Sequence, residues 1–138
     1  SRSDGMSKYN AKKVEYKEIV FDSKVECEYY KHLENRLHID GFDEIEVQPR
    51  YELIPKIGKQ RKSEYIADFA LLSEGKLIEV IDVKGMATET AKLKAKFFRY
   101  LYPDVKLTWI CKAPKYTGLE WITYEDLIKA RRERKKAK

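Results

Sequence analysis

The sequence lacks any apolar run long enough to cross a membrane, since no stretch approaches the roughly 18 consecutive apolar residues that a spanning helix needs. Its N-terminus also lacks the basic-then-apolar pattern of a secretory signal. We therefore expect a cytoplasmic protein that has no membrane partner.

Cysteine and histidine are scarce, with two residues of each. Cys27 and Cys111 stand apart, without a Cys-x-x-Cys pair or a Cys/His cluster, which disfavours a disulfide framework and a zinc module. His32 and His38 belong to a helical pattern, so we expect them on a helix surface and not in catalysis. We expect no small-molecule cofactor.

Glycine and proline are also few, with six and four residues, whereas apolar residues make up 43% of the 138 positions. This composition is typical of one globular domain. We assign that domain to residues 6–130, because residues 1–5 precede Met6 and resemble a vector remnant. Residues 131–138 form a basic tail that carries five of the six net positive charges. The tail could contact phosphates or be a solvated helix end, and both interpretations remain open.

The apolar pattern predicts alternating strands and helices. The expected order is a hairpin over residues 14–21, a helix from Asp22 or Ser23 to about His38, β structure over 45–54 that Pro49 interrupts, a hairpin of strands 65–72 and 77–84, a helix over 88–102, a strand over 105–111 and a last helix capped by Thr123. Strand 77–84 is almost continuously apolar, so it should be central in the sheet. A whole helix separates it from strand 105–111, which favours parallel pairing of the two.

The strand expected to be most buried contains a charged residue, Asp82, and ends at Lys84. An ionised carboxylate in such a place costs several kcal/mol unless it is paired or binds a metal. Because side chains alternate along a strand, Asp82 and Lys84 point to one face and Val83 points to the other. The same parity sends Glu79 to the face opposite Asp82.

A second acid, Asp68, interrupts the neighbouring hairpin strand. A turn centred on Glu74 and Gly75 pairs residues whose numbers sum to about 149 or 150, which places Asp68 across from Ile81 or Asp82. Two carboxylates, a carbonyl and several waters suit Mg²⁺ or Mn²⁺.

Lys84 completes this chemistry, because a lysine on the metal-binding face can stabilise or deprotonate a water poised against a phosphodiester. A salt bridge from Asp68 or Asp82 to Lys84, with no ion bound, is the simpler interpretation. Two buried acids and a lysine on one face of adjacent strands favour the metal site.

Two segments, Ile66-Ala67-Asp68-Phe69 and Asp82-Val83-Lys84-Gly85, resemble the motif of the PD-(D/E)XK nuclease superfamily, which has the restriction-endonuclease-like fold. The family's proline before the first acid is Ala67 here. The stretch from Lys8 to about Ile110 also resembles a family of small phage- and prophage-encoded proteins of this superfamily. The resemblance implies an α/β fold with a three-layer core, in which helices beginning near Ser23 and Thr88 flank a central mixed sheet of four or five strands.

The resemblance also implies the roles of individual residues. Asp68, Asp82 and the Val83 backbone carbonyl would bind Mg²⁺ or Mn²⁺, and Lys84 would position the nucleophile. Glu26 matches a glutamate that the family places near the metal. It also fits a capping box in Ser23-x-x-Glu26, and that alternative remains open.

Further residues could contact nucleic acid. Gln48 matches a polar position that several branches place on a strand close to the site, although a surface glutamine is an equal alternative. On the helix over 88–102, Lys92, Lys96 and Arg99 form a basic stripe in a place where the family often contacts DNA phosphates, and a solvated face is the alternative. On the same helix, the residues expected to face the core are Ala91, Leu93, Phe97, Tyr100 and Leu101.

Together these expectations describe a Mg²⁺-dependent deoxyribonuclease that hydrolyses phosphodiester bonds of DNA in the cytoplasm of a phage's host. The sequence has no helix-turn-helix or other recognisable reader of base sequence, which favours a nicking or structure-directed endonuclease, for example on Holliday junctions or branched DNA in phage recombination, replication or packaging. A homodimer would suit such two-fold substrates. The competing hypotheses are a catalytically silent nucleic-acid-binding module on the same fold and a protein-interaction domain with a structural salt bridge.

Overall fold

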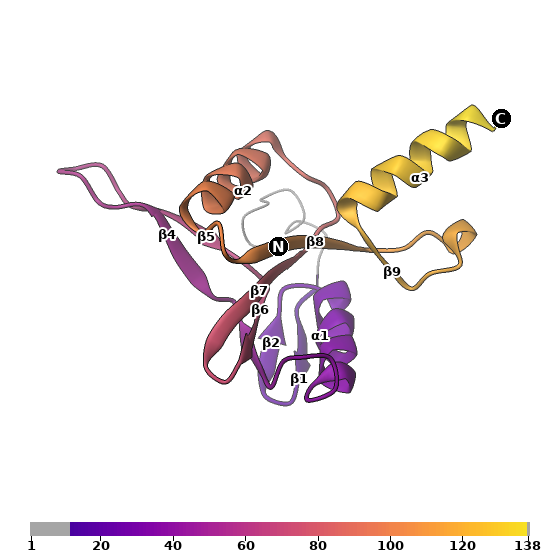
Figure 1. Cartoon of the computed structure of the whole chain (residues 1–138), viewed down its shortest axis with the longest axis horizontal. Coiled ribbons are helices and arrows are strands. Elements are labelled where there is room, and N and C mark those ends of the chain that lie inside the picture. Colours follow the sequence, from indigo (N-terminus) through magenta and orange to yellow (C-terminus); the bar gives the residue numbers. More distant parts are fainter. Residues whose placement is uncertain (1–11, 138) are drawn as a thin grey trace.

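The computed structural model describes residues 12–137, so the predicted vector remnant and the predicted domain start at Met6 lie outside the described residues. The helices and the main strands follow the predicted order, but the stretches 45–54 and 65–72 each divide into two strands (Figure 1). The elements are β1 (Val14–Tyr16), β2 (Ile19–Phe21), α1 (Lys24–Arg36), β3 (Glu44–Val47), β4 (Arg50–Ile54), β5 (Ser63–Ile66), β6 (Phe69–Ser73), β7 (Lys76–Val83), α2 (Glu89–Leu101), β8 (Lys106–Lys112), a short 3₁₀ helix η2 (Lys115–Thr117), β9 (Trp121–Thr123) and α3 (Tyr124–Lys136).

Five strands form a central mixed sheet in the order β3-β6-β7-β8-β9. β7 is the middle strand, as its apolar sequence predicted, and it pairs in parallel with β8 across the α2 crossover. The other neighbours in this sheet pair antiparallel. β9 was not predicted, because its three residues are too few to show an alternating pattern.

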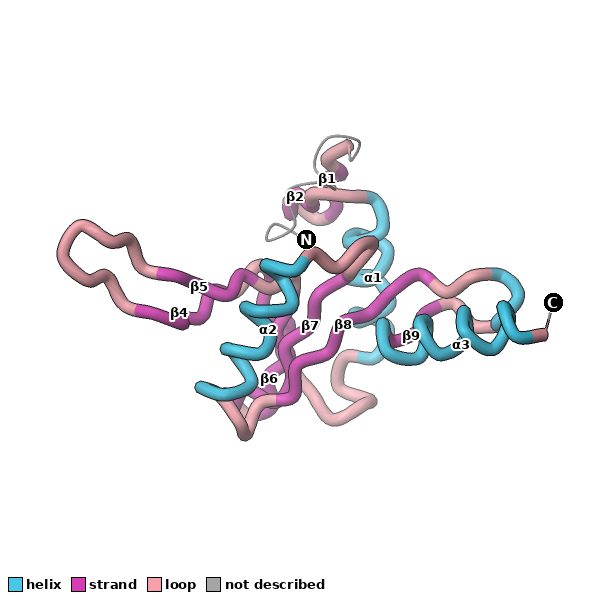
Figure 2. Tube along the Cα trace, turned by 90° about the horizontal axis from the view of Figure 1, so that it is seen from above, coloured by secondary structure: helices cyan, strands magenta, loops and turns pink. Residues whose placement is uncertain are grey.

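Helices cover both faces of the sheet and make three layers, which confirms the predicted α/β class (Figures 1 and 2). On one face, α1 and the β1–β2 hairpin pack over an apolar cluster that includes Phe69 and Ile81. On the other face, Phe98 of α2 packs with Val80 and Leu107. Among the described residues, no helix combines the length and the apolar character needed to span a membrane.

Each α-helix begins at a hydroxyl cap, and the sequence predicts the caps at Ser23 and Thr123. The side-chain oxygens of Ser23, Thr88 and Thr123 accept hydrogen bonds from backbone N–H groups three residues later, at 3.2, 3.1 and 3.2 Å. These bonds satisfy donors that a helix start leaves unpaired. The caps therefore fix where α1, α2 and α3 leave the sheet.

The predicted continuous strand over residues 65–72 is wrong, because the chain changes partners at Ala67 and Asp68. The Ala67 N–H donates to the carbonyl of Pro49 at 3.1 Å, whereas the Asp68 N–H donates to the carbonyl of Ile81 at 3.1 Å. Before this point β5 pairs with β4 in a separate hairpin, and after it β6 pairs with β7. The switch places Asp68 at the junction of the two sheets.

The predicted core face of α2 is also wrong, apart from Ala91. The buried residues are Ala91, Ala95 and Phe98, which recur at helical spacing and face the sheet. The more apolar side of the helix points outward, with Leu93 63% and Tyr100 80% exposed. Phe97 and Leu101 are exposed as well.

Candidate active site

Buried charge gathers at the carboxyl end of β7. Within residues 12–137, the buried charged side chains are Glu26, Asp68, Asp82 and Lys84, each no more than 3% exposed. They come from α1, from the β5–β6 junction and from the end of β7. These are also the four side chains that the sequence singled out.

Asp68 and Asp82 lie across from each other on neighbouring chain segments. Phe69 pairs with Ile81, so extending the register by one residue places Asp68 opposite Asp82, as the predicted hairpin turn requires. The Asp68 N–H donates to Asp82 Oδ1 at 3.2 Å, and the Val83 N–H donates to Asp68 Oδ2 at 2.7 Å. Each carboxylate is therefore oriented by the backbone of the other strand.

Asp82 is also held by Tyr65, which Trp109 supports in turn, and the sequence pattern singled out neither residue. The Tyr65 hydroxyl donates to Asp82 Oδ2, and the Trp109 indole N–H donates to the Tyr65 hydroxyl oxygen at 2.9 Å. Trp109 occupies the β8 position that pairs with Asp82. Part of this signal was present, because a parallel β8 must place some residue there. The register could not be read, however, since the crossover is a whole helix.

Lys84 brings an ammonium group to the same side of the site. Its Nζ lies 3.9 Å from Asp82 Oδ2 and 4.8 Å from the centre of the Trp109 ring. The side chain is 1% exposed, and Nζ has no hydrogen-bond partner among the described residues. A lysine has three donors, so this long ion pair leaves donors available to a further group in the site.

Burial controls the ionisation of the two aspartates. It raises the pKa of Asp68 well above its ordinary value, and the nearby carboxylates of Asp82 and Glu26 raise it further. Burial also raises the pKa of Asp82, while the charge of Lys84 and the hydrogen bond from Tyr65 oppose that rise. The pair therefore tends to retain a proton when no cation is nearby.

Glu26 and Gln48 lie near the site on different elements, α1 and the link between β3 and β4. The Glu26 N–H donates to Ser23 Oγ at 3.2 Å, so the capping interaction expected of Ser23 is present. α1 packs against β7, and the buried Glu26 carboxylate is one of the charges that raise the pKa of Asp68. Gln48 lies in the link between β3 and β4 instead of on a strand, with φ 55°, and its N–H donates to the Asp68 carbonyl at 2.9 Å.

The donor set fits a hard divalent cation better than zinc. Asp68 Oδ1 accepts no hydrogen bond from the described residues, and Asp82 and the Val83 carbonyl are the other nearby oxygen candidates. The part of the chain that the structure describes holds no group of three His, Cys, Asp or Glu residues that could bind a metal. Two carboxylates completed by a carbonyl and water suit Mg²⁺ or Mn²⁺, whereas a zinc site calls for more side-chain ligands.

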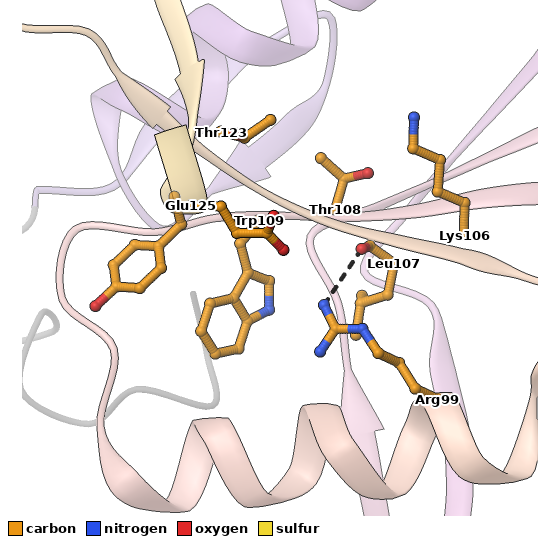
Figure 3. Close-up of a pocket in the computed structure, with 8 residues that line it drawn as sticks. Arg99, Lys106, Leu107, Thr108, Trp109, Thr123 and Glu125 are labelled. Atoms are coloured by element: carbon orange, nitrogen blue, oxygen red, sulfur yellow. Dashed lines mark hydrogen bonds between the residues drawn. The ribbon is translucent and has the colours of Figure 1, made fainter. Parts of the chain in front are cut away.

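The three residues of the predicted basic stripe on α2 do not all point the same way. Lys92 and Lys96 are exposed, and Lys92 Nζ lies 3.4 Å from Glu89 Oε1. Arg99 instead turns toward β8 and donates to the Leu107 carbonyl at 3.4 Å, in a cavity of about 190 Å³ (Figure 3). Trp109 lines this cavity and also contacts Lys84, so the cavity borders the site through that one ring.

The comparisons with known proteins give one match. A family model described as "Protein of unknown function (DUF1064)" matches residues 6–118, a range that contains all four buried charged residues. No curated protein matches the chain, and no solved structure matches it.

Proposed function

The chain belongs to the DUF1064 family of proteins of unknown function, and we propose that it is a Mg²⁺- or Mn²⁺-dependent DNA endonuclease of the PD-(D/E)XK type. The observation that carries the proposal is the burial of Glu26, Asp68, Asp82 and Lys84 at one end of β7. Three acids and one lysine in that arrangement suit phosphodiester hydrolysis.

The energetics support a functional role for these residues. Buried ion pairs often stabilise a fold less than apolar side chains of similar volume would. Lys84 illustrates this, because its ammonium is buried and yet 3.9 Å from the nearest carboxylate oxygen. Strongly shifted pKa values among grouped acids are also typical of functional sites. A purely structural pair would favour a shorter contact with all donors satisfied.

Each residue has a role in the proposal. Asp68, Asp82 and the Val83 carbonyl hold the cation, and the Tyr65 hydroxyl keeps Asp82 in position. The cation, when bound, neutralises charge on the phosphate that is attacked. The Lys84 ammonium orients the attacking water and stabilises negative charge on the phosphoryl oxygens. Glu26 accepts a hydrogen bond from water in the site.

The proposed activity is structure-directed or nicking cleavage, for example of branched DNA, because no reader of base sequence is recognisable in the sequence. A homodimer remains part of this proposal, since two-fold junctions and duplex cuts need two sites.

A specific observation favours a second candidate, the catalytically silent nucleic-acid-binding module. Both oxygens of Asp82 already accept hydrogen bonds, from Tyr65 and from the Asp68 N–H. In that case, the buried network would be structural, and a divalent cation would change neither thermal stability nor the fate of DNA.

A cleavage assay separates the two candidates. Supercoiled plasmid and linear, nicked, flap and four-way DNA are incubated with the protein in Mg²⁺, Mn²⁺ or EDTA. We expect metal-dependent cleavage that falls at least about 100-fold in Asp82→Ala and in Lys84→Ala, both still folded by circular dichroism. Glu79→Gln is the matched control, because Glu79 lies on the same strand but bonds Thr108 on the opposite face. Cleavage retained in Asp82→Ala would contradict the endonuclease, and binding without cleavage in either metal would favour the silent module.

A further inference from the structure

The β4–β5 hairpin is an arm that leaves the body of the molecule (Figures 1 and 2). Its two strands form a sheet of their own, separate from the central sheet. The residues that join them, 55–62, are all exposed. We call the strands with this tip the basic arm.

The tip concentrates positive charge. It contains Lys56, Lys59, Arg61 and Lys62 and no acidic residue. Within residues 12–137, only Lys62 of these four has an acidic partner, Glu64, at 3.7 Å. Beside these cations Ile57 is 60% exposed, although it is a large apolar side chain. Such a surface suits a polyanion that also offers apolar contacts.

The arm is an ordered ribbon. Ile57 and Gln60 close the tip with two backbone hydrogen bonds of 3.1 and 2.8 Å. At the base, Tyr65 is 1% exposed and its ring lies 5.2 Å from that of Phe98 on α2. The Tyr102 hydroxyl adds a hydrogen bond of 2.8 Å to the Glu52 carbonyl. The base is therefore fixed to α2 while the tip stands free.

The base of the arm is also part of the candidate active site. β5 leads directly into Asp68, and Tyr65 on β5 donates to Asp82. At the start of β4, the Pro49 carbonyl accepts from the Ala67 N–H, and the Gln48 N–H donates to the Asp68 carbonyl. A ligand held by the tip is thus placed at a fixed distance and direction from the two aspartates.

We infer that the basic arm is a duplex-DNA-binding element that lies in a groove beside the phosphodiester to be cut. This inference rests on the proposed function for the identity of the substrate. The major groove of B-DNA admits a two-stranded β-ribbon, and lysine and arginine side chains contact the phosphates at its edges. Ile57 at the tip would contact thymine methyl groups, which are the apolar part of the major groove.

The test replaces Lys56, Lys59, Arg61 and Lys62 together by glutamine. All four side chains are exposed, so the variant should keep the thermal stability of the wild type. A matched control replaces four exposed cations of α3, Arg131, Arg132, Lys135 and Lys136, by glutamine, which lowers the net charge equally. Binding to a labelled 30-base-pair duplex is followed by fluorescence anisotropy in EDTA over a range of salt concentrations.

We expect the arm variant to bind at least tenfold more weakly than the control variant at about 0.1 M salt. Its log Kd against log salt should lose a slope of about 3 to 4, since each phosphate contact contributes about 0.9. In the cleavage assay its KM should rise while kcat stays within about twofold, because the side chains of the site are unchanged. Equal losses in the two variants would mean that the arm contributes no more than another basic segment of the chain and would overturn the inference, as would unchanged binding by the arm variant.

Failure of this inference can be told from failure of the proposed function. Binding through the arm without cleavage in any metal overturns the endonuclease and keeps the arm as a DNA-binding element. Cleavage with equal KM in wild type and arm variant would support the endonuclease activity and overturn the DNA-binding role of the arm.

Discussion

At the carboxyl end of β7, residues 81–84, the two faces of the strand carry opposite kinds of side chain. On the α1 side, Ile81 and Val83 join an apolar cluster that includes Phe69. On the α2 side, the same four-residue stretch presents Asp82, followed by Lys84. All of these residues are buried, so the contrast lies in chemistry and not in exposure.

In the proposed enzyme, the end of β7 would serve stability on one face and function on the other. Apolar burial stabilises the fold by roughly 25 cal/mol per Å² removed from water. Buried carboxylates oppose folding unless hydrogen bonds and opposite charges compensate them. We therefore expect Phe69, Ile81 and Val83 to stabilise the fold, and Asp82 and Lys84 to stabilise it less than apolar residues of similar volume would.

The largest effect on stability is expected for Phe69→Ala. Phe69 is 0% exposed and lies among the rings of Phe21, Tyr29 and Tyr30. Removing its ring should lower the free energy of unfolding by about 3 to 5 kcal/mol, measured by urea denaturation. Tyr100→Ala, at a position 80% exposed, is the control and should change it by less than about 0.5 kcal/mol. Equal effects at the two positions would mean that the apolar cluster around Phe69 does not stabilise the fold.

Much of the fold could be predicted from local patterns. The capping residues and the apolar periodicity gave the helix positions, and the run of apolar residues gave the central place of β7. The change of pairing partner at Ala67 could not be predicted, because the alternating pattern of a strand is the same whichever sheet the strand joins. The outward apolar side of α2 could not be predicted either, since Ala91 and Ala95 let the helix sit close to the sheet while larger residues remained outside.

The candidate site shows the same division. The proximity of Asp68, Asp82 and Lys84 could be predicted, because strand parity and a short hairpin turn fix which residues lie on one face and which lie opposite each other. Tyr65 and Trp109 could not, since their contacts with each other and with Asp82 depend on how β5 and β8 meet β7 in space. Sequence patterns therefore identified the charges, and the tertiary structure identified what holds them.

A smaller effect on stability is expected for Tyr65→Phe, which tests whether the Tyr65 hydroxyl holds Asp82 in place. The change removes the hydroxyl between Asp82 and Trp109, so the buried Asp82 carboxylate and the half-buried Trp109 indole each lose a hydrogen bond. The free energy of unfolding should fall by about 1 to 3 kcal/mol. Tyr102→Phe loses a hydrogen bond to the Glu52 carbonyl at an exposed position and should cost about 1 kcal/mol or less. A loss no greater than that of Tyr102→Phe would show that the hydroxyl does not hold Asp82.

The smallest effect expected has the opposite sign, in Asp68→Asn measured without divalent cations. Because burial and the carboxylates of Asp82 and Glu26 raise the pKa of Asp68 in the folded protein, folding favours its protonated form. The contribution of this group to stability is therefore full below its unfolded pKa and is lost as pH rises through the folded pKa. Asparagine carries no such charge, so the variant should be more stable than wild type at pH 8, by about 0.5 to 2 kcal/mol, with a smaller difference at pH 4.

The pH dependence of the stability gained in Asp68→Asn would show that the gain comes from loss of the Asp68 charge. Asparagine can still accept the hydrogen bond from the Val83 N–H, so packing and hydrogen bonding are nearly matched between variant and wild type. Mg²⁺ should raise the Tm of the wild type more at pH 8 than at pH 5, since a cation favours the ionised carboxylate, and it should leave the Tm of Asp68→Asn nearly unchanged. A variant less stable than wild type at pH 8 would mean that the Asp68 carboxylate stabilises the fold. The charged residues at the end of β7 would then contribute to stability, as the apolar cluster does.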